Sequence, residues 1–483
     1  MAPARTARDA GIMKQRRLTA ALTLLLSLGA TAPALAAPAT APAPAPAAGS
    51  AARTGERADD RVVRAVERAA HPLRSTDPSA PDDDLRALDR MIGDARVVGI
   101  GEATHNSRDF FTLKQRAFRH LVRDRGFRTY ALEAPWSTGL RLNDYVLHGK
   151  GDPRRIMREE FQDAYLFWNT REYLSLLTWM RSWNRAHPDD PVRFMGNDVS
   201  WAGPELYDRV LDHVRTTDPA ALPRLAELYR GLRPDAPTGP YMRAYLTKPP
   251  AERRAMAERA DRALELVRSL RPGRGRAAAE AQRWAVQNAR VVQQSARQYA
   301  FDLTAEKDIA AAMRFRDRTM AANTAWWQEE TGTKVLLSAH NGHVQYETDD
   351  PAHYPRTQGA YLRDHYGPRY VNVGLTFGRG SFNAVGADDA MLDRNVRRVT
   401  VGPDAPGSNG ATLDRAHVGA GAGYLLDLRT APAPARDWLR QARPTRNIGT
   451  AYPWPEGQVA LARSFDVLIH LHRVEAADRL PSD

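Results

Sequence analysis

Four segments of the sequence carry carboxylate and imidazole side chains, the groups that enzymes most often use to move protons. Glu102 and His105 stand three residues apart, Glu133 and Asp198 follow as single carboxylates, and residues 340–343 read His-Asn-Gly-His. A neutral histidine can take a proton from water, and a neighbouring carboxylate can fix its tautomer. These residue types predict general acid–base catalysis.

Each of these segments directly follows a short apolar run that predicts a buried β-strand. The runs are Arg96–Ile100, Thr129–Leu132, Val192–Met195 and Lys334–Ala339. In open α/β sheets, ligands bind in the crevice at the carboxyl ends of the strands. We therefore expect the four segments to line one pocket.

The rest of the chain alternates apolar runs with helical patterns, which is typical of α/β proteins. Later strands are expected at Tyr370–Leu375, Arg398–Val401, Tyr424–Leu428 and Phe465–Leu471. Continuous rather than alternating apolar character predicts strands covered on both faces. The pattern from residue 204 onward is helical and carries no strand signal, so a helical insertion is expected at about residues 204–300. The predicted fold class is α/β, with a central, mostly parallel sheet flanked by helices and with this helical insertion.

A helix is expected to begin just after His105. Apolar residues recur with helical spacing from Phe110 to Val122, and Gly126 stands where a C-terminal cap belongs. The positive end of this helix disfavours a charged imidazole, so we expect His105 to be neutral and able to accept a proton. Glu102 could bind its other ring nitrogen.

The other carboxylates allow two interpretations each. Glu133 ends a buried strand, so it must be paired or hydrogen-bonded, either as a general acid or base or as the partner of an arginine. Pro135 and Trp136 follow it directly and indicate a loop that lines the cleft. Asp198 either contributes to the pocket or caps the next helix.

The histidines at 340 and 343 also allow two interpretations. They could ligate zinc together with nearby carboxylates, although this spacing on a loop is a weak metal signal. They could instead donate hydrogen bonds to a developing oxyanion and protonate a leaving alkoxide. Two further histidines, His470 and His472, alternate along the last apolar run and predict one face of an edge strand.

Several other catalytic templates do not fit the sequence. The chain has no cysteine, which excludes a thiol nucleophile and cysteine-ligated metals. It also contains no GxSxG elbow, P-loop or Rossmann glycine motif. Lys and Arg exceed Asp and Glu by 69 to 57, but acidic residues are interspersed and no basic stripe with stacking aromatics occurs. Nucleic-acid binding is therefore not expected.

The beginning of the chain has the pattern of a secretory signal. Basic residues precede the uncharged run Leu18–Ala30, which is too short to span a membrane, and Ala34-Leu35-Ala36 offers a cleavage site. We expect residues 1–36 to be a signal peptide and the Ala/Pro-rich residues 37–55 to be a disordered tether. Residues 56–483 would then form one secreted domain with no membrane association after cleavage.

The chain resembles the erythromycin esterase family at a series of motifs in family order. They are Gly101-Glu-Ala-Thr-His105 with Ser107, Arg108 and Phe110, Ala131-Leu-Glu133, Asn143-Asp144-Tyr145, Arg316-Asp317 with Met320, Ala339-His-Asn-Gly-His343, and the stretch from Tyr361 to Phe382. The resemblance covers roughly residues 82–474. Asn106 and Asn197 depart from the family pattern, in positions that alter the pocket wall more than the catalytic set.

The resemblance implies an α/β fold and, for the esterase members, hydrolysis of the macrolactone of 14-membered macrolide antibiotics. It implies that His105 is the general base that activates water and that the other catalytic residues are Glu102, Glu133, His340 and His343. Candidate substrate contacts are Arg108, Trp136, Asp198 and Asn341. No metal or other cofactor is expected.

The leading hypothesis is a secreted hydrolase that cleaves a small-molecule carboxylic ester or lactone with water activated by His105. No covalent acyl-enzyme is expected, because no serine or cysteine nucleophile is indicated. One alternative is a metal-dependent hydrolase that uses His105, His340, His343 and a carboxylate. The other is a non-catalytic secreted binding protein.

Overall fold

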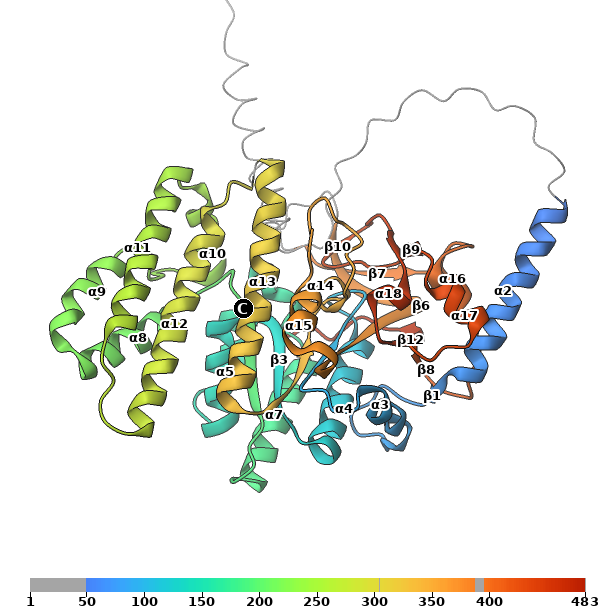
Figure 1. Ribbon diagram of the computed structural model, residues 1–483, viewed down its shortest axis with the longest axis horizontal. Coiled ribbons are helices and arrows are strands. Elements are labelled where there is room, and N and C mark those ends of the chain that lie inside the picture. Colours follow the sequence, from blue (N-terminus) through green and yellow to red (C-terminus); the bar gives the residue numbers. More distant parts are fainter. Residues whose placement is uncertain (1–48, 304, 387–394, 483) are drawn as a thin grey trace, which may run out of the picture.

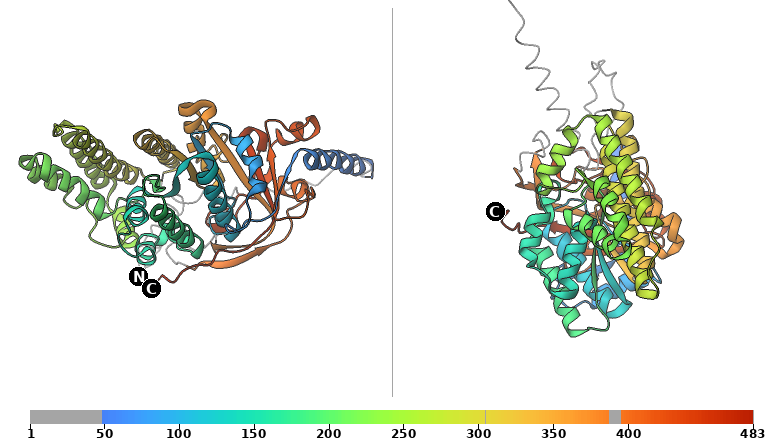
Figure 2. Two further views of the ribbon diagram at one scale, coloured as in Figure 1. Left: turned by 90° about the horizontal axis from the view of Figure 1, so that it is seen from below. Right: turned by 90° about the vertical axis from the view of Figure 1, so that its left-hand side faces the viewer.

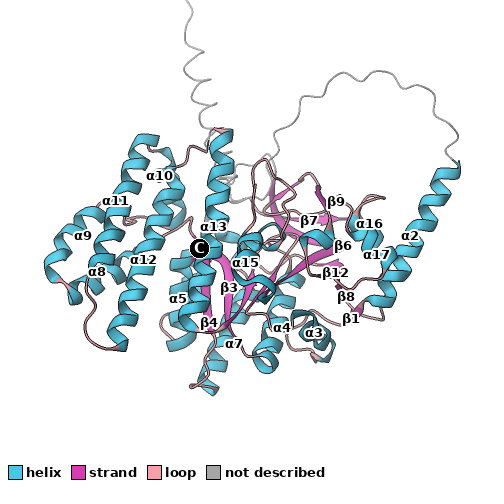
Figure 3. Ribbon diagram, in the orientation of Figure 1, coloured by secondary structure: helices cyan, strands magenta, loops and turns pink. Residues whose placement is uncertain are grey.

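The structure is a computed structural model that describes residues 49–303, 305–386 and 395–482. Within this part of the chain, ten strands form one sheet in the order β1-β8-β12-β6-β2-β5-β3-β4, and β7 and β10 pair with β6. Helices flank the sheet, whose strands are magenta in Figure 3. The predicted α/β class with a mostly parallel central sheet is confirmed.

The strands of the main sheet agree closely with the apolar runs of the sequence. Their bounds are β1 His71–Leu73, β2 Val97–Ile100, β3 Phe127–Pro135, β4 Arg193–Asp198, β5 Lys334–Ser338, β6 Tyr370–Gly386, β7 Arg397–Val401, β8 Gly423–Asp427, β10 Ala451–Tyr452 and β12 Val467–Val474. A separate pair consists of β9 Arg443–Thr445 and β11 Gly457–Val459. All eight predicted strands are present.

The register of the sheet brings the carboxyl ends of three strands together. β2 pairs in parallel with β5 on one side and β6 on the other, and β5 pairs in parallel with β3. β3 in turn pairs in parallel with β4. The segments that follow β2, β3 and β5 therefore lie at the same edge of the sheet. β12 lies between β6 and β8, so the prediction that it is an edge strand is wrong.

Helices make up most of the remaining structure. They are α2 Gly49–Ala69, α3 Arg86–Ile92, α4 Arg108–Arg125, α5 Trp136–His148, α6 Pro153–Glu160, α7 Arg171–Ala186, α8 Pro204–Thr217, α9 Leu222–Tyr229, α10 Thr238–Thr247, α11 Pro250–Ser269, α12 Arg276–Ala300, α13 Glu306–Thr331, α14 Asn341–Val344, α15 Gln358–Tyr366, α16 Asn409–Leu413, α17 Ala433–Leu439 and α18 Leu461–Ser464. Four short 3-10 helices, at Asp83–Leu85, Asp163–Trp168, Pro219–Ala221 and Gly367–Arg369, connect them.

The expected helix after His105 is α4, and its two ends follow from the sequence. Ser107 occupies the N-cap position, and Gly126 ends the helix with φ +70°, where its N–H binds the carbonyl of Leu121. Glycine suits this left-handed position because it has no Cβ to clash. The predicted C-terminal cap is confirmed.

Helices α8 to α12 form the insertion between β4 and β5. Figure 1 shows them gathered on one side of the sheet, and the left view of Figure 2 places them at one end of the molecule with α2 at the other. The helix α13 returns the chain to β5 and contacts β4 and α15. This arrangement leaves the carboxyl ends of β2, β3 and β5 to the loops and to α14.

The N-terminal predictions fall largely outside the described residues. The expected signal peptide, residues 1–36, lies entirely outside them. Helix α2 spans Gly49–Ala69, and the boundary between tether and domain at residue 55 stays a prediction. Among the helices of the described ranges, none combines the length and the apolar character needed to cross a bilayer.

The segment after β12, residues 475–481, runs back over the start of α4. Ala476 bridges Ser107, and Arg479 bridges Thr170. The N–H of Arg108 donates to the carbonyl of Glu475 at 2.7 Å. This C-terminal segment thus contacts both the loop before α4 and the segment that carries Trp168.

Candidate active site

The loop between β2 and α4 holds Glu102 and His105 against each other. His105 Nδ1 lies 2.9 Å from Glu102 Oε1, and both side chains are buried. Gly101 precedes them at a close approach, because a Cβ there would lie 2.0 Å from Asn341 Oδ1. The carboxylate accepts a hydrogen bond from Nδ1–H, which leaves the lone pair of a neutral His105 on Nε2.

Lys114 of α4 holds the far side of the Glu102 carboxylate. Its ammonium donates to Glu102 Oε2, to Ser338 Oγ at 3.1 Å and to the carbonyl of Ala339 at 3.3 Å. Burial lowers the pKa of Lys114, while the charge of Glu102 opposes that shift. The lysine thus fixes the carboxylate that orients His105 and connects it to the end of β5.

His340 follows β5 and faces His105. The two ring centroids are 5.0 Å apart. His340 Nδ1 accepts from the N–H of Gly342 at 3.2 Å, so a neutral ring carries its proton on Nε2, which has no hydrogen-bond partner among the described residues. Burial above all lowers the pKa of His340 well below its ordinary value, and the charge of His343 adds to this shift. His340 is therefore a neutral imidazole with a free N–H donor.

Glu133 lies at the centre of a buried network of charges. Its Oε2 accepts from the backbone N–H of His340 at 2.9 Å, and its Oε1 lies 3.1 Å from both Arg316 Nη2 and His343 Nε2. Burial alone would raise the pKa of Glu133, but His343 and Arg316 hold it well below its ordinary value. Glu133 therefore stays ionised and pairs with an arginine, one of its two predicted roles, and it also positions His340.

His343 lies between two carboxylates. Nε2 faces Glu133, and Nδ1 lies 2.8 Å from Asp317 Oδ1. Burial would lower the pKa of His343, but Asp317 and Glu133 raise it to about 10. His343 is therefore cationic near neutrality, with Asp317 beside Nδ1 and Glu133 beside Nε2, and Arg316 Nη1 also lies 3.0 Å from Nε2. It stabilises the network rather than facing His105.

The raised pKa of His343 predicts a loss of stability at alkaline pH. An unfolded histidine titrates near about 6.5, whereas the folded group titrates at about 10. The contribution of His343 to the free energy of unfolding is complete below pH 6.5. It is lost as the pH rises toward 10, and the free energy of unfolding then falls by at most about 1.4 kcal/mol per pH unit. Urea unfolding between pH 6 and 10 measures this slope.

The control for this titration is the exposed pair of His365 and Glu329. A His365→Asn variant should show the same dependence of unfolding free energy on alkaline pH as the wild type. A His343→Gln variant should lose the share of this dependence that comes from the proton of His343. An equal slope in the wild type and in His343→Gln would contradict the assignment.

The metal-dependent alternative requires free lone pairs that converge on one point. His340 uses Nδ1 to accept a hydrogen bond, and both nitrogens of His343 face carboxylates. Among the described residues, metal-ligating atoms converge instead at Asp414, His470 and His472 and at Asp82, His120 and Asp124. The predicted ligand set of His105, His340, His343 and a carboxylate is therefore not arranged around a shared cation.

Asp198 and Asn341 have structural partners. Asp198 accepts from Arg316 Nη2 at 2.8 Å and from the hydroxyl of Tyr165 at 2.9 Å, and α8 begins only at Pro204, so it does not cap that helix. The side-chain amide of Asn341 bonds both to the N–H and to the carbonyl of Leu375, at 3.1 and 2.8 Å. Both predicted substrate contacts are thus occupied by protein groups.

Arg108 is directed away from the paired histidines. Its guanidinium forms an ion pair with Glu475 at 2.7 Å, and both side chains are more than 40% exposed. The motif spacing placed it next to His105 in sequence, but the first turn of α4 directs it to the surface. The prediction that Arg108 binds substrate is not supported by this geometry.

Removal of this surface ion pair is expected to have little effect. An Arg108→Ala variant should lose less than about 1 kcal/mol of unfolding free energy, because exposed pairs contribute roughly 0.2–1 kcal/mol. Its KM and kcat should equal those of the wild type. A KM raised tenfold or more would restore Arg108 to the substrate site.

Trp136 begins α5 and does not lie on a loop. Its ring packs against Trp284, Trp326 and Trp327, and its N–H donates to Asn288 Oδ1 at 3.1 Å. It therefore belongs to the junction between the sheet and the insertion. The expectation of a loop at this position is wrong, because a helix starts directly after Pro135, and the packing of Trp136 does not support a place in the catalytic cleft.

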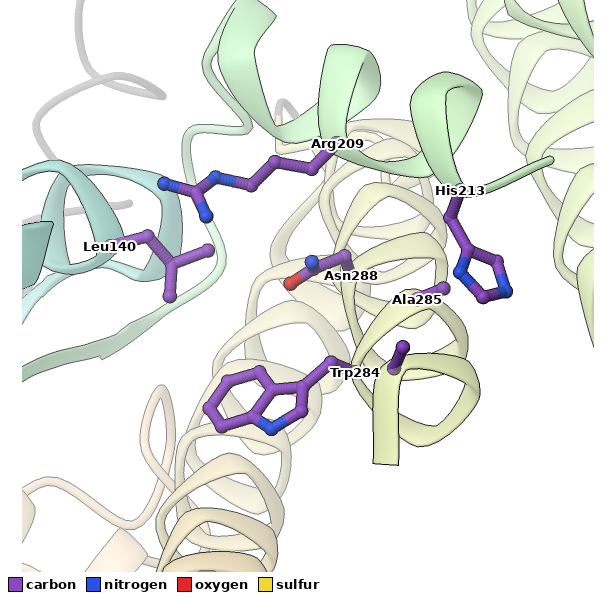
Figure 4. A pocket seen from close by; sticks show the side chains of 7 residues that line it. Leu140, Arg209, His213, Trp284, Ala285 and Asn288 are labelled. Atoms are coloured by element: carbon purple, nitrogen blue, oxygen red, sulfur yellow. The ribbon is translucent and has the colours of Figure 1, made fainter. Parts of the chain in front are cut away.

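A cavity of about 260 Å³ lies within this junction. It is lined by Leu140, Arg209, His213, Ala281, Trp284, Ala285 and Asn288. Figure 4 shows Arg209 and His213 on one helix and Trp284 and Asn288 on another. The five predicted catalytic residues are not part of its lining, so this cavity is distinct from the histidine pair.

Lys114 and Arg316 are two buried cations of the site to which the sequence patterns gave no role. Lys114 lies on the apolar stripe of α4, four residues from both Phe110 and Phe118. A lysine at such a buried helical position could have indicated a buried carboxylate partner. Arg316 was visible only as part of a family motif. Both groups are fully buried with carboxylate partners, as buried cations require.

Comparisons with known proteins agree with this fold. Residues 122–474 match the family model for erythromycin esterase. Erythromycin esterase type II of Escherichia coli is 31% identical over 156 residues, which are 31% of this chain and 35% of that protein. The chain thus spans about a third of the length of the curated relatives that it matches.

The solved structures cover much more of the chain. A protein of Bacillus cereus and a succinoglycan biosynthesis protein each superpose with a TM-score of 0.76 at 26% identity, over 88% and 87% of this chain and 99% of theirs. The erythromycin esterase mutant EreC in its open conformation shares the fold at a TM-score of 0.64, with 17% identity over 85% of this chain and 99% of that one.

The family model covers more than half of the sequence and includes the strands and helices that carry Glu133, Arg316, His340 and His343. Three superposed structures share the fold around them. The chain belongs to the erythromycin esterase family.

Proposed function

We propose that this chain is a secreted hydrolase that cleaves a carboxylic ester or lactone with water activated by His105. The observation that carries the proposal is the pair of buried imidazoles with complementary protonation. Glu102 leaves the lone pair of His105 on Nε2, and Gly342 leaves the proton of His340 on Nε2. One ring can accept a proton, and the ring 5.0 Å away can donate a hydrogen bond.

The proposed reaction uses these two groups in turn. His105 Nε2 takes a proton from water as the oxygen attacks the carbonyl carbon. The tetrahedral oxyanion accepts a hydrogen bond from His340 Nε2–H, which is worth roughly 10²–10³-fold in rate at comparable sites. His105 then returns the proton to the leaving alkoxide, which gives a carboxylic acid and an alcohol.

The buried ionic network around Glu133 supports the roles of His105 as base and His340 as hydrogen-bond donor. Glu133 stays negative and holds the backbone of His340, while the cations His343 and Arg316 balance its charge. The resulting low pKa of His340 keeps that ring neutral.

The substrate class that we propose is a macrolactone or a related ester. The support is membership of the erythromycin esterase family and the name of the E. coli relative, whose match is limited to part of its length. The N-terminal sequence pattern supports export from the cell. Detection of the processed chain in the culture medium tests that part.

The experiment is a screen of esters, lactones and 14-membered macrolides by mass spectrometry. A mass gain of one water identifies both substrate and reaction, and it should disappear with His105→Ala. Chelator treatment should not change the rate. If no compound gains water while some bind saturably, the proposal fails and the non-catalytic binding alternative replaces it.

A further inference from the structure

A second histidine–carboxylate cluster lies outside the candidate active site. Asp414 follows α16, and His470 and His472 lie on β12 on the same side of the strand. Asp414 Oδ1 is 2.8 Å from His472 Nδ1 and 3.3 Å from His470 Nε2. One ligand atom from each residue lies within 4.8 Å of the other two.

These separations suit a transition metal. In tetrahedral zinc sites with bonds of about 2.0–2.1 Å, two ligand atoms lie roughly 3.3 Å apart. Two imidazoles and one carboxylate form a ligand set that zinc accepts readily. The three atoms can therefore reach one cation with small side-chain rotations.

His470 has the supporting partner that a metal-bound histidine requires. Its Nδ1 lies 2.9 Å from Thr376 Oγ1 on β6, while its Nε2 is directed at Asp414. A proton on Nδ1, donated to the hydroxyl, would leave the Nε2 lone pair for a metal. Metal-ligating histidines usually donate their second N–H in this manner.

The neighbouring strand leaves room for the carboxylate. A Cβ on Gly378 of β6 would lie 2.3 Å from Asp414 Oδ1 and 2.6 Å from Oδ2. Glycine at this position thus allows Asp414 to approach the sheet and meet the histidines. The close approach would be impossible with any other residue unless Asp414 moved.

Within the described part of the chain, no lysine or arginine forms an ion pair with Asp414. Among the ion pairs of the described residues, its partners are His470 and His472. The other convergent group, at Asp82, His120 and Asp124, differs because Arg123 pairs with Asp82. A cation is therefore better accommodated at Asp414.

The cluster is also open to solvent on one side. His470 is buried, whereas Asp414 and His472 are 20% and 27% exposed. The ring of exposed His417 lies next to His472, with centroids 6.0 Å apart. An ion can enter from this side, and water or His417 can complete its coordination.

We propose that Asp414, His470 and His472 form a zinc site that is separate from the proposed hydrolytic centre. A bound ion would connect the end of α16 to β12, an interior strand of the sheet. Figure 1 shows α16 on the side of the molecule opposite to the helical insertion. The site would therefore stabilise the C-terminal half of the sheet.

The test is zinc titration of the full chain after removal of metals, against a competing chromophoric chelator. The wild type should bind one equivalent of zinc, and its thermal midpoint should rise with zinc. Asp414→Asn and His472→Asn should lose this equivalent. Thr376→Val, which keeps the shape of a buried side chain, should weaken zinc binding by about 10–100-fold.

Two variants distinguish this site from other histidines and carboxylates. His365→Asn removes an exposed imidazole that pairs with Glu329 and should leave zinc binding unchanged. Asp124→Asn alters the other convergent group and should also leave it unchanged. Absence of stoichiometric binding in the wild type overturns the proposal. Binding that survives His472→Asn in a folded protein, or that is lost with Asp124→Asn, overturns it equally.

Discussion

Replacement of His105 by alanine is expected to leave a folded protein whose turnover is lower by about 10²–10⁴-fold or more. The loss follows because His105 Nε2 is the group that takes the proton from water in the proposed reaction. Glu102 keeps its bond to Lys114 in this variant, so the loop retains a partner for the buried carboxylate. Steady-state kinetics on the identified substrate, together with circular dichroism, measures both effects.

The matched control is His353, which also pairs with a carboxylate three residues away, at 3.0 Å from Asp350. A His353→Ala variant should keep wild-type turnover. A His105→Ala protein that is unfolded would indicate a structural histidine. A folded His105→Ala protein with undiminished turnover would refute the assignment of His105 as the base.

Replacement of Arg316 by methionine is expected to cost about 3–5 kcal/mol of unfolding free energy. The variant leaves the buried carboxylates of Glu133 and Asp198 without the guanidinium that contacts both of them. Removal of one partner from a buried ion pair is costly because the remaining charge cannot be solvated. Urea unfolding followed by tryptophan fluorescence measures the change.

The control for this loss is the exposed bidentate pair of Arg233 and Asp208. Arg233→Met should change the unfolding free energy by less than about 1 kcal/mol. If Arg316→Met does not accumulate as a folded protein, Arg316→Lys can be measured instead. This variant keeps the positive charge but lacks the guanidinium that contacts two carboxylates, so its loss of unfolding free energy should lie between zero and that expected for Arg316→Met. Equal stabilities of Arg316→Met and Arg233→Met would show that the network does not stabilise the fold.

Most of the sheet could be predicted because its strands are covered on both faces and therefore have continuous apolar sequences. The short strands β1, β9, β10 and β11 were not predicted. They contain two or three residues each, too few to form an apolar run, and β1 and β9 also include proline. The second half of β6 was also missed, because Gly378 and Gly380 interrupt its apolar pattern.

The paired histidines could be predicted because each directly follows a parallel strand, whose carboxyl end has a fixed place in the fold. Glu102 and Glu133 were found for the same reason. Side chains on helices carry no such constraint in the sequence, since their direction depends on how the helix packs. Lys114 and Arg316 therefore received no role, and the geometry does not support the substrate contacts expected of Arg108 and Trp136.

The C-terminal segment has a practical consequence for handling the protein. Residues 475–481 bridge Ser107, next to the proposed base, and Thr170, near Trp168, whose ring contacts His105 at 5.4 Å. A chain cut after Val474 by a contaminating carboxypeptidase would keep every proposed catalytic group but lose the C-terminal segment whose backbone bonds to Asn106 and Arg108 hold the loop that carries His105. The mass of the purified chain should therefore be measured to confirm that the C-terminal residues are present. Only then can low activity be explained by a poor choice of substrate.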